Sequence, residues 1–166
     1  MSKASVMLAA GGTGGHLYPA FALAQELGRR DIPVDLVTDM RGDRYGANFP
    51  ARAVYRVPSA TLAGRSPIAA ATTAWMLGRG IVASYSLLGT VKPGAVVGFG
   101  GYASVPTMLA ASFGGYPTVL HEQNAILGRA NRLLASRVQR IPTSFENSEG
   151  IPEDAAGKVV RTGMPV

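Results

Sequence analysis

The chain has 166 residues, of which 47% are hydrophobic and 16% are charged, a composition that suits one folded domain with its own core and excludes a disordered chain. It contains no cysteine, which excludes disulfide frameworks and thiolate metal sites. The formal net charge of +6 favours an anionic partner, whether a phosphorylated ligand, an acidic lipid surface or nucleic acid.

Short apolar runs alternate with longer helical runs, a pattern typical of βαβ units around a parallel sheet buried on both faces. Strands are predicted at residues 4–10, 33–38, 52–57, 94–98, 117–121, 138–141 and 158–162. Helices are predicted at residues 17–29, 67–88, 104–113 and 127–136. The predicted fold class is therefore α/β, a doubly wound, mostly parallel, Rossmann-like sheet with strand order 3-2-1-4-5-6.

A glycine-rich turn follows the first predicted strand and opens the first helix. Backbone N–H groups and the positive end of a helix can bind an anion at such a place. The residues of this turn that are candidates for binding a diphosphate are Gly11, Gly12, Thr13, Gly14 and Gly15. The dinucleotide pattern G-x-G-x-x-G fails because Leu17 stands where the third glycine belongs, and no Lys-Ser or Lys-Thr follows to make a nucleoside triphosphate loop.

A second glycine loop, GFGGYAS at residues 98–104, repeats this design, with Ser104 as the expected helix N-cap. The residues of this loop that are candidates for binding the same diphosphate are Gly100, Gly101, Tyr102 and Ser104. Because the first and fourth strands are neighbours in the predicted order, both loops should face one crevice at the carboxyl ends of the strands. Gly98, Gly100 and Ala103 match G-x-G-x-x-A, which keeps a nucleotide-dependent oxidoreductase open as a distant alternative.

Polar side chains gather at the ends of the first and fifth strands. His16, at the start of the first helix, is either a general base or a structural cap. In the LHEQNA stretch, Glu122 is a candidate base or acceptor from sugar hydroxyls, and Gln123 and Asn124 suit hydrogen bonds to a substrate. His121 is expected to be structural.

The stretch from residue 66 to 91 is the most apolar part of the chain, and Arg79 interrupts it. A long helix packed on the sheet is the favoured interpretation. The alternative is an interfacial patch in which Trp75, Arg79 and Ile81 contact an anionic membrane surface.

Four arginines follow the LHEQNA stretch, and a solvated basic face is the default interpretation of them: Arg129, Arg132, Arg137 and Arg140. A nucleic-acid module needs aromatic stacking residues among such charges or a known motif. Neither is found, so no nucleic-acid partner is expected.

Three segments in this order and spacing resemble the amino-terminal domain of the MurG family, the bacterial N-acetylglucosaminyltransferases of peptidoglycan synthesis: GGTGGHLYPAFALAQEL, GFGGYASVPTMLAA and HEQNAILGRANRLLA. The resemblance covers essentially the whole chain. It implies one half of a two-domain GT-B architecture. It also implies an inverting enzyme that transfers N-acetylglucosamine from UDP-N-acetylglucosamine to the 4-hydroxyl of the N-acetylmuramoyl group of lipid I, giving lipid II.

The resemblance further implies that no cofactor or metal is required and that the protein lies on the cytoplasmic face of the inner membrane. His16 matches a proposed catalytic base of the family, Tyr102 and Ser104 match polar positions of the second loop, and residues 122–124 match the third motif.

The expected organisation is an acceptor-binding domain over residues 1–162 and the start of an interdomain linker at 163–166, with the UDP-sugar held mainly by a second domain absent from this chain. We expect the chain alone to bind the acceptor diphosphate and the membrane and to be inactive. A non-enzymatic membrane-surface or diphosphate-binding module is the main alternative.

Overall fold

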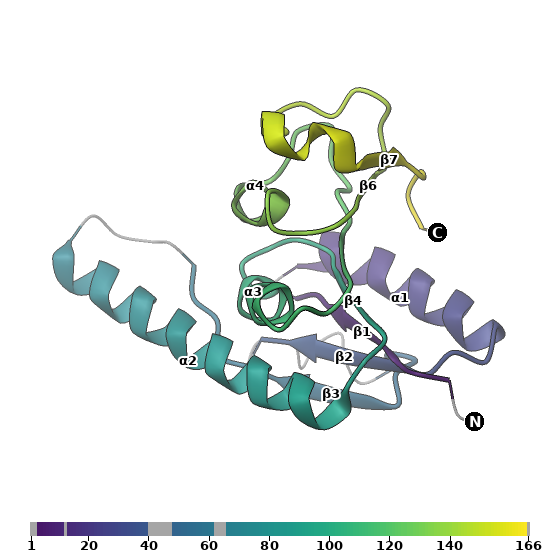
Figure 1. Cartoon of the computed structure of the whole chain (residues 1–166), viewed down its shortest axis with the longest axis horizontal. Coiled ribbons are helices and arrows are strands. Elements are labelled where there is room, and N and C mark those ends of the chain that lie inside the picture. The colour runs from purple at the N-terminus through teal and green to yellow at the C-terminus, as the bar shows by residue number, and fades with distance from the viewer. Residues whose placement is uncertain (1–2, 12, 40–47, 62–65, 166) are drawn as a thin grey trace.

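The computed structural model describes residues 3–11, 13–39, 48–61 and 66–165 (Figure 1). Its main sheet is formed by β1 (Val6–Ala9), β2 (Val34–Thr38), β3 (Ala53–Arg56), β4 (Ala95–Gly98) and β5 (Thr118–Leu120). All neighbouring strands are parallel, and their order is β3-β2-β1-β4-β5. The α/β, Rossmann-like class and the adjacency of the first and fourth strands are therefore confirmed.

The last two strands depart from the prediction of one continuous sheet. β6 (Ile141–Thr143) and β7 (Val159–Arg161) form a separate two-stranded parallel sheet. Isolated bridges from Val119 to Arg140 and from Glu122 to Thr143 link the segment of β5 to that of β6 without a continuous ladder between the two strands. The physical reason is Pro142, which accepts from the Glu122 N–H but has no N–H of its own to donate in the middle of this pairing.

The helices lie close to their predicted positions. They are α1 (Gly14–Arg29), α2 (Pro67–Val91), α3 (Val105–Phe113) and α4 (Arg129–Ala135). The short 3₁₀ helix η2 (Glu153–Lys158) was not predicted. α1 begins three residues before the predicted start, so His16 lies within its first turn. The Ser66 hydroxyl caps α2 by accepting the Ala69 N–H, and Lys92 ends it with a φ of 51°.

The two faces of the sheet bury separate cores, as expected for strands covered on both sides. Along β1, Met7 and Ala9 pack with residues of α2 and α3, whereas Leu8 and Ala10 pack with α1. Figure 1 shows the consequence, with α1 on one side of the sheet and α2 and α3 on the other. All the βα turns that carry the candidate site therefore open at the carboxyl ends of the strands.

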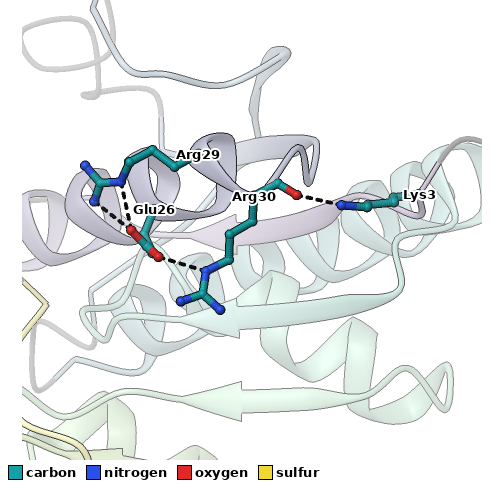
Figure 2. A network of polar contacts seen from close by, with 4 residues as sticks. All are labelled: Lys3, Glu26, Arg29 and Arg30. Atoms are coloured by element: carbon teal, nitrogen blue, oxygen red, sulfur yellow. Dashed lines mark hydrogen bonds and ion pairs between the residues drawn. The ribbon is translucent and has the colours of Figure 1, made fainter.

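The carboxyl end of α1, away from the glycine loops, carries a surface ion-pair network (Figure 2). Glu26 accepts from Arg29 and Arg30 at 2.8 and 2.7 Å. Lys3 Nζ donates to the Arg30 carbonyl oxygen at 2.6 Å, which ties the segment before β1 to the end of α1. This network lies a full helix length from the first glycine loop.

No helix within the described ranges is both long and apolar enough to cross a membrane, α2 included.

Candidate functional site

The two glycine loops meet beside the ends of β1 and β4. The register pairs Ala9 with Gly98, so both loops leave the sheet side by side. Gly11 is buried, and a methyl group on it would lie 3.0 Å from Ala103 Cβ and closer still to Thr38. Glycine is needed there for close packing between the loops. The predicted convergence of the loops is confirmed, and the diphosphate they were expected to bind stays a prediction.

The second loop also makes room for the ring of His16. Gly100 and Gly101 have φ values of 89° and 72°, in the left-handed region that favours glycine. A methyl group on Gly101 would lie 3.1 Å from His16 Cδ2 and 3.3 Å from Nε2. The ring of His16 therefore lies directly against the backbone of the second loop.

The Phe99 carbonyl oxygen determines which nitrogen of His16 carries the proton. It lies 2.9 Å from His16 Nδ1, and a carbonyl oxygen can only accept, so Nδ1 is the donor. In the neutral ring the free electron pair is then on Nε2. Gln123 Nε2 donates to the same oxygen at 2.8 Å, so this carbonyl has two donors that hold its direction. Gln123 is buried and braces the second loop.

Glu122 has an environment that argues against its expected role as a base. Its side chain is 1% exposed. Oε1 accepts from both the backbone N–H and the side-chain amide of Asn124, and Oε2 accepts from the Gly128 N–H and Asn131 Nδ2, at 2.7–3.0 Å. A base needs an oxygen free to take a substrate proton. The carboxylate instead holds the 122–128 loop against α4.

Asn131 is a member of the site that the sequence did not single out. Its Nδ2 donates to Glu122 and to the His121 carbonyl oxygen, while Oδ1 is buried without a partner. A methyl group on Gly100 would lie 3.1 Å from that oxygen. The available signal was a polar residue on the buried face of α4, whose other buried residues are Ala130, Leu134 and Ala135.

Ser104, a candidate residue for binding the diphosphate, has its hydroxyl engaged within the second loop. It is fully buried, and its hydroxyl donates to the Gly101 carbonyl oxygen at 2.9 Å. It occupies the N-cap position of α3 but makes no side-chain capping bond. Its hydroxyl instead closes the second loop on itself, and Tyr102 in the same loop is half-buried.

The first glycine loop leaves the start of α1 open. Thr13 is the N-cap residue and makes no side-chain capping bond, and no acidic residue lies in the first turn. Thr13 and Gly15 are exposed and Gly14 is half-buried, so this turn lies at the surface of the protein. Gly12 lies outside the described residues.

His121 is buried, as the sequence predicted for a structural histidine. Nε2 donates to the Gly163 carbonyl oxygen at 3.2 Å, across 42 residues. Burial lowers the pKa of His121, while the Gly163 carbonyl and the charge of Glu122 oppose this effect in part. The ring fastens the segment after β7 to the end of β5.

A cavity of about 310 Å³, called here the site cavity, brings these groups together. Its lining includes His16, Gly101, Tyr102, Asn124 and Asn131. Across the described part of the chain, no three His, Cys, Asp or Glu side chains gather in a way that would hold a metal ion. The site cavity therefore combines the imidazole of His16 with amide side chains, backbone groups, the Tyr102 phenol and the charged side chains of Glu122 and Arg129.

The three residues expected to contact a membrane do not share one face of α2. Trp75 is 69% exposed and Arg79 is exposed, whereas Ile81 is half-buried and packs against the core. Trp75 has Ile68 and Val82 seven residues before and after it, exposed by 80% and 71%. We call Ile68, Trp75 and Val82 the outer stripe. Figure 1 shows the first half of α2 projecting beyond the sheet.

Comparison with known proteins identifies the family to which this chain belongs. A family model described as "Glycosyltransferase family 28 N-terminal domain" matches residues 6–143. A protein of Rhizobium leguminosarum bv. trifolii, named UDP-N-acetylglucosamine--N-acetylmuramyl-(pentapeptide) pyrophosphoryl-undecaprenol N-acetylglucosamine transferase, is 51% identical over 168 residues, which is 100% of this chain and 44% of that protein. A protein of the same name from Sinorhizobium fredii is 52% identical over 169 residues, with the same coverage.

Among solved structures, MurG of Acinetobacter baumannii superposes with a TM-score of 0.76 at 27% identity, over 97% of this chain and 45% of that one. The chain spans about half the length of the relatives it matches. Since the family model covers most of its residues, the chain belongs to the glycosyltransferase family 28 N-terminal domain family.

Proposed function

We propose that this chain is the acceptor-binding half of a transferase that moves N-acetylglucosamine from UDP-N-acetylglucosamine to lipid I, forming lipid II in peptidoglycan synthesis. Identity of about half over the whole chain with proteins named for this reaction supports the proposal. The single structural observation that carries it is His16, whose Nδ1 donates to the Phe99 carbonyl oxygen and whose Nε2 lies against the second glycine loop.

In the proposed reaction His16 Nε2 accepts the proton of the muramoyl 4-hydroxyl. The hydroxyl oxygen forms the new bond to the anomeric carbon of N-acetylglucosamine, the bond from that carbon to the UDP oxygen breaks, and the anomeric configuration inverts. The Phe99 carbonyl favours this step because it stays bonded to Nδ1–H when the ring becomes positively charged. Asn124, at the rim of the site cavity, is a candidate donor or acceptor for the acceptor sugar.

The domain boundary, the donor and the absence of a cofactor form part of this proposal. Residues 1–162 make the acceptor domain, residues 163–166 begin a linker, and a second domain holds most of UDP-N-acetylglucosamine. The proposed proton transfer takes place between the acceptor hydroxyl and His16 and does not involve a metal ion. The chain by itself is accordingly expected to have little transferase activity.

Substitution of His16 tests the proposal in a full-length form that contains the donor domain. His16→Asn keeps a side-chain N–H near the Phe99 oxygen but has no atom in place of Nε2, and His16→Ala loses both. We expect both to lower kcat by about 10²–10⁴-fold, the usual contribution of a general base, with the melting temperature of the Asn variant unchanged. Wild-type kcat in His16→Asn would reduce this residue to a structural role.

We further propose that the outer stripe of α2 rests on the cytoplasmic face of an anionic membrane, where the acceptor lipid is found. Arg79 is the sole charged residue of α2 and lies exposed beside Trp75. Exposed apolar side chains with a neighbouring cation suit the boundary between lipid headgroups and acyl chains.

Trp75→Ser should weaken binding to phosphatidylglycerol vesicles by about tenfold, since a large apolar side chain is lost from the contact. Phe113→Ser, which removes an aromatic side chain that is 62% exposed elsewhere, is the matched control and should bind like wild type. Equal vesicle binding by the Trp75→Ser variant and wild type would contradict the proposed contact.

A further inference from the structure

A second cavity adjoins the site cavity and is lined by two arginines. Its volume is about 430 Å³, and its lining residues are Tyr102, Arg129, Arg132 and Leu133. We call it the arginine cavity. Tyr102 and Arg129 line the site cavity as well, so the two spaces are neighbours. Arg129 and Arg132 are three residues apart on α4, which places both on one side of the helix.

Neither guanidinium has a hydrogen-bond or ion-pair partner among the residues that the structure describes. Arginines elsewhere in the chain do have partners. Arg29 and Arg30 share Glu26 (Figure 2), and Arg52 binds Asp35 through two nitrogens. None of the described residues that line the arginine cavity is acidic. Two uncompensated positive charges therefore face one open volume.

The groups around the two guanidinium groups position Arg132 and leave Arg129 without a neutralising carboxylate among the described residues. The Arg132 guanidinium lies against Gly150, whose φ of 77° and missing side chain make room for it. The nearest carboxylate in the site cavity, that of Glu122, is already engaged by four N–H groups. Glu122 is thus not available to neutralise Arg129.

We propose that Arg129 and Arg132, together with the Tyr102 hydroxyl, bind the phosphate oxygens of a diphosphate. A guanidinium group matches phosphate geometry with two parallel N–H donors, and the Tyr102 phenol adds an O–H donor. The glycine loops offer only neutral N–H groups, so the arginine cavity supplies the charge that they lack.

This inference rests on the proposed function for the identity of its ligand. If the acceptor hydroxyl lies at His16 Nε2, the diphosphate on the same sugar enters the neighbouring space, which is the arginine cavity. The solvated basic face expected from the sequence is then a binding surface at two of its four positions, Arg129 and Arg132.

Calorimetric titration of the 166-residue chain with inorganic pyrophosphate tests the inference without turnover or donor sugar. We expect Arg129→Gln/Arg132→Gln to raise Kd by about 10-fold to 100-fold, as expected when charged hydrogen bonds to phosphate are lost. Arg29→Gln/Arg30→Gln removes the same net charge at the far end of α1, about 24 Å along the helix from its first turn. That control should bind pyrophosphate like wild type.

Unchanged pyrophosphate affinity in Arg129→Gln/Arg132→Gln would overturn the inference, and so would an equal loss in both double variants, because that result reports net charge alone. A lipid headgroup offers the same phosphate chemistry, so sedimentation with phosphatidylglycerol vesicles forms a second arm. If Arg129→Gln/Arg132→Gln weakened vesicle binding but not pyrophosphate binding, the arginines would be membrane contacts and the inference would fail. An inactive full-length enzyme with arginine-dependent pyrophosphate binding would refute only the proposed function.

Discussion

Two glutamates of this chain each bind several donors, in opposite surroundings. Glu26 is 38% exposed and pairs with two arginines that are 68% exposed (Figure 2). Glu122 is 1% exposed, and its donors among the described residues are uncharged N–H groups of the 122–131 segment. Water can reach the carboxylate of Glu26 and take the place of its partners, whereas the carboxylate of Glu122 is shielded from water. Burial, rather than the charge of the donors, therefore decides which carboxylate the fold depends on.

The largest effect is expected from Glu122→Gln, which keeps the shape of the side chain but turns one oxygen into a donor. At least one buried N–H would then face another donor, and the free energy of unfolding should fall by about 3 kcal/mol. Urea unfolding followed by circular dichroism measures this loss.

Asn124→Ala is the control for the Glu122 variant, because it deletes a partner that lies at the surface. It should cost clearly less than Glu122→Gln in the same urea titration. Equal costs for the two variants would mean that the loop depends on each hydrogen bond alike and not on the buried carboxylate.

A smaller, pH-dependent effect is expected at His121, next to Glu122. Its pKa is lowered from the ordinary value of 6.5 mainly by burial, so the unfolded chain binds a proton more readily than the folded one. The stability that neutral His121 contributes is thus present above about pH 6.5 and is lost as the pH falls below it. Melting temperatures at about pH 7.5 and 5.5 measure the loss.

His121→Gln keeps a donor for the Gly163 carbonyl but does not titrate, so its melting temperature should fall less than that of wild type between these two pH values. Parallel pH profiles for the two proteins would show that the acid sensitivity arises elsewhere.

The smallest effect is expected from Glu26→Gln. Both arginines remain solvated when the carboxylate is removed, and exposed ion pairs add little to stability. The urea midpoint should be unchanged at physiological salt. A measurable drop there would remove the contrast with Glu122 and would show that the end of α1 depends on its surface network.

Much of the fold was predictable because its signals are local. Apolar strand runs, glycine turns and helix starts depend on residues close in sequence, so all seven strands and four helices were predicted near their true positions. The adjacency of β1 and β4 followed from the general topology of such sheets. The separation of β6 from the main sheet was not predictable in this way. It arises because Pro142 has no N–H to donate to the neighbouring β5 segment, and this pairing joins residues that are distant in the sequence.

The sequence by itself determined which polar groups would gather at the strand ends, with His16 and the 121–124 segment among them. Only the tertiary structure decided their roles, because those depend on partners distant in the chain. His16 is oriented by a carbonyl 83 residues away, and Glu122 is covered by donors from its own loop and α4. A residue type states what a side chain can do, whereas burial and hydrogen-bond partners decide which of its atoms remain free to act.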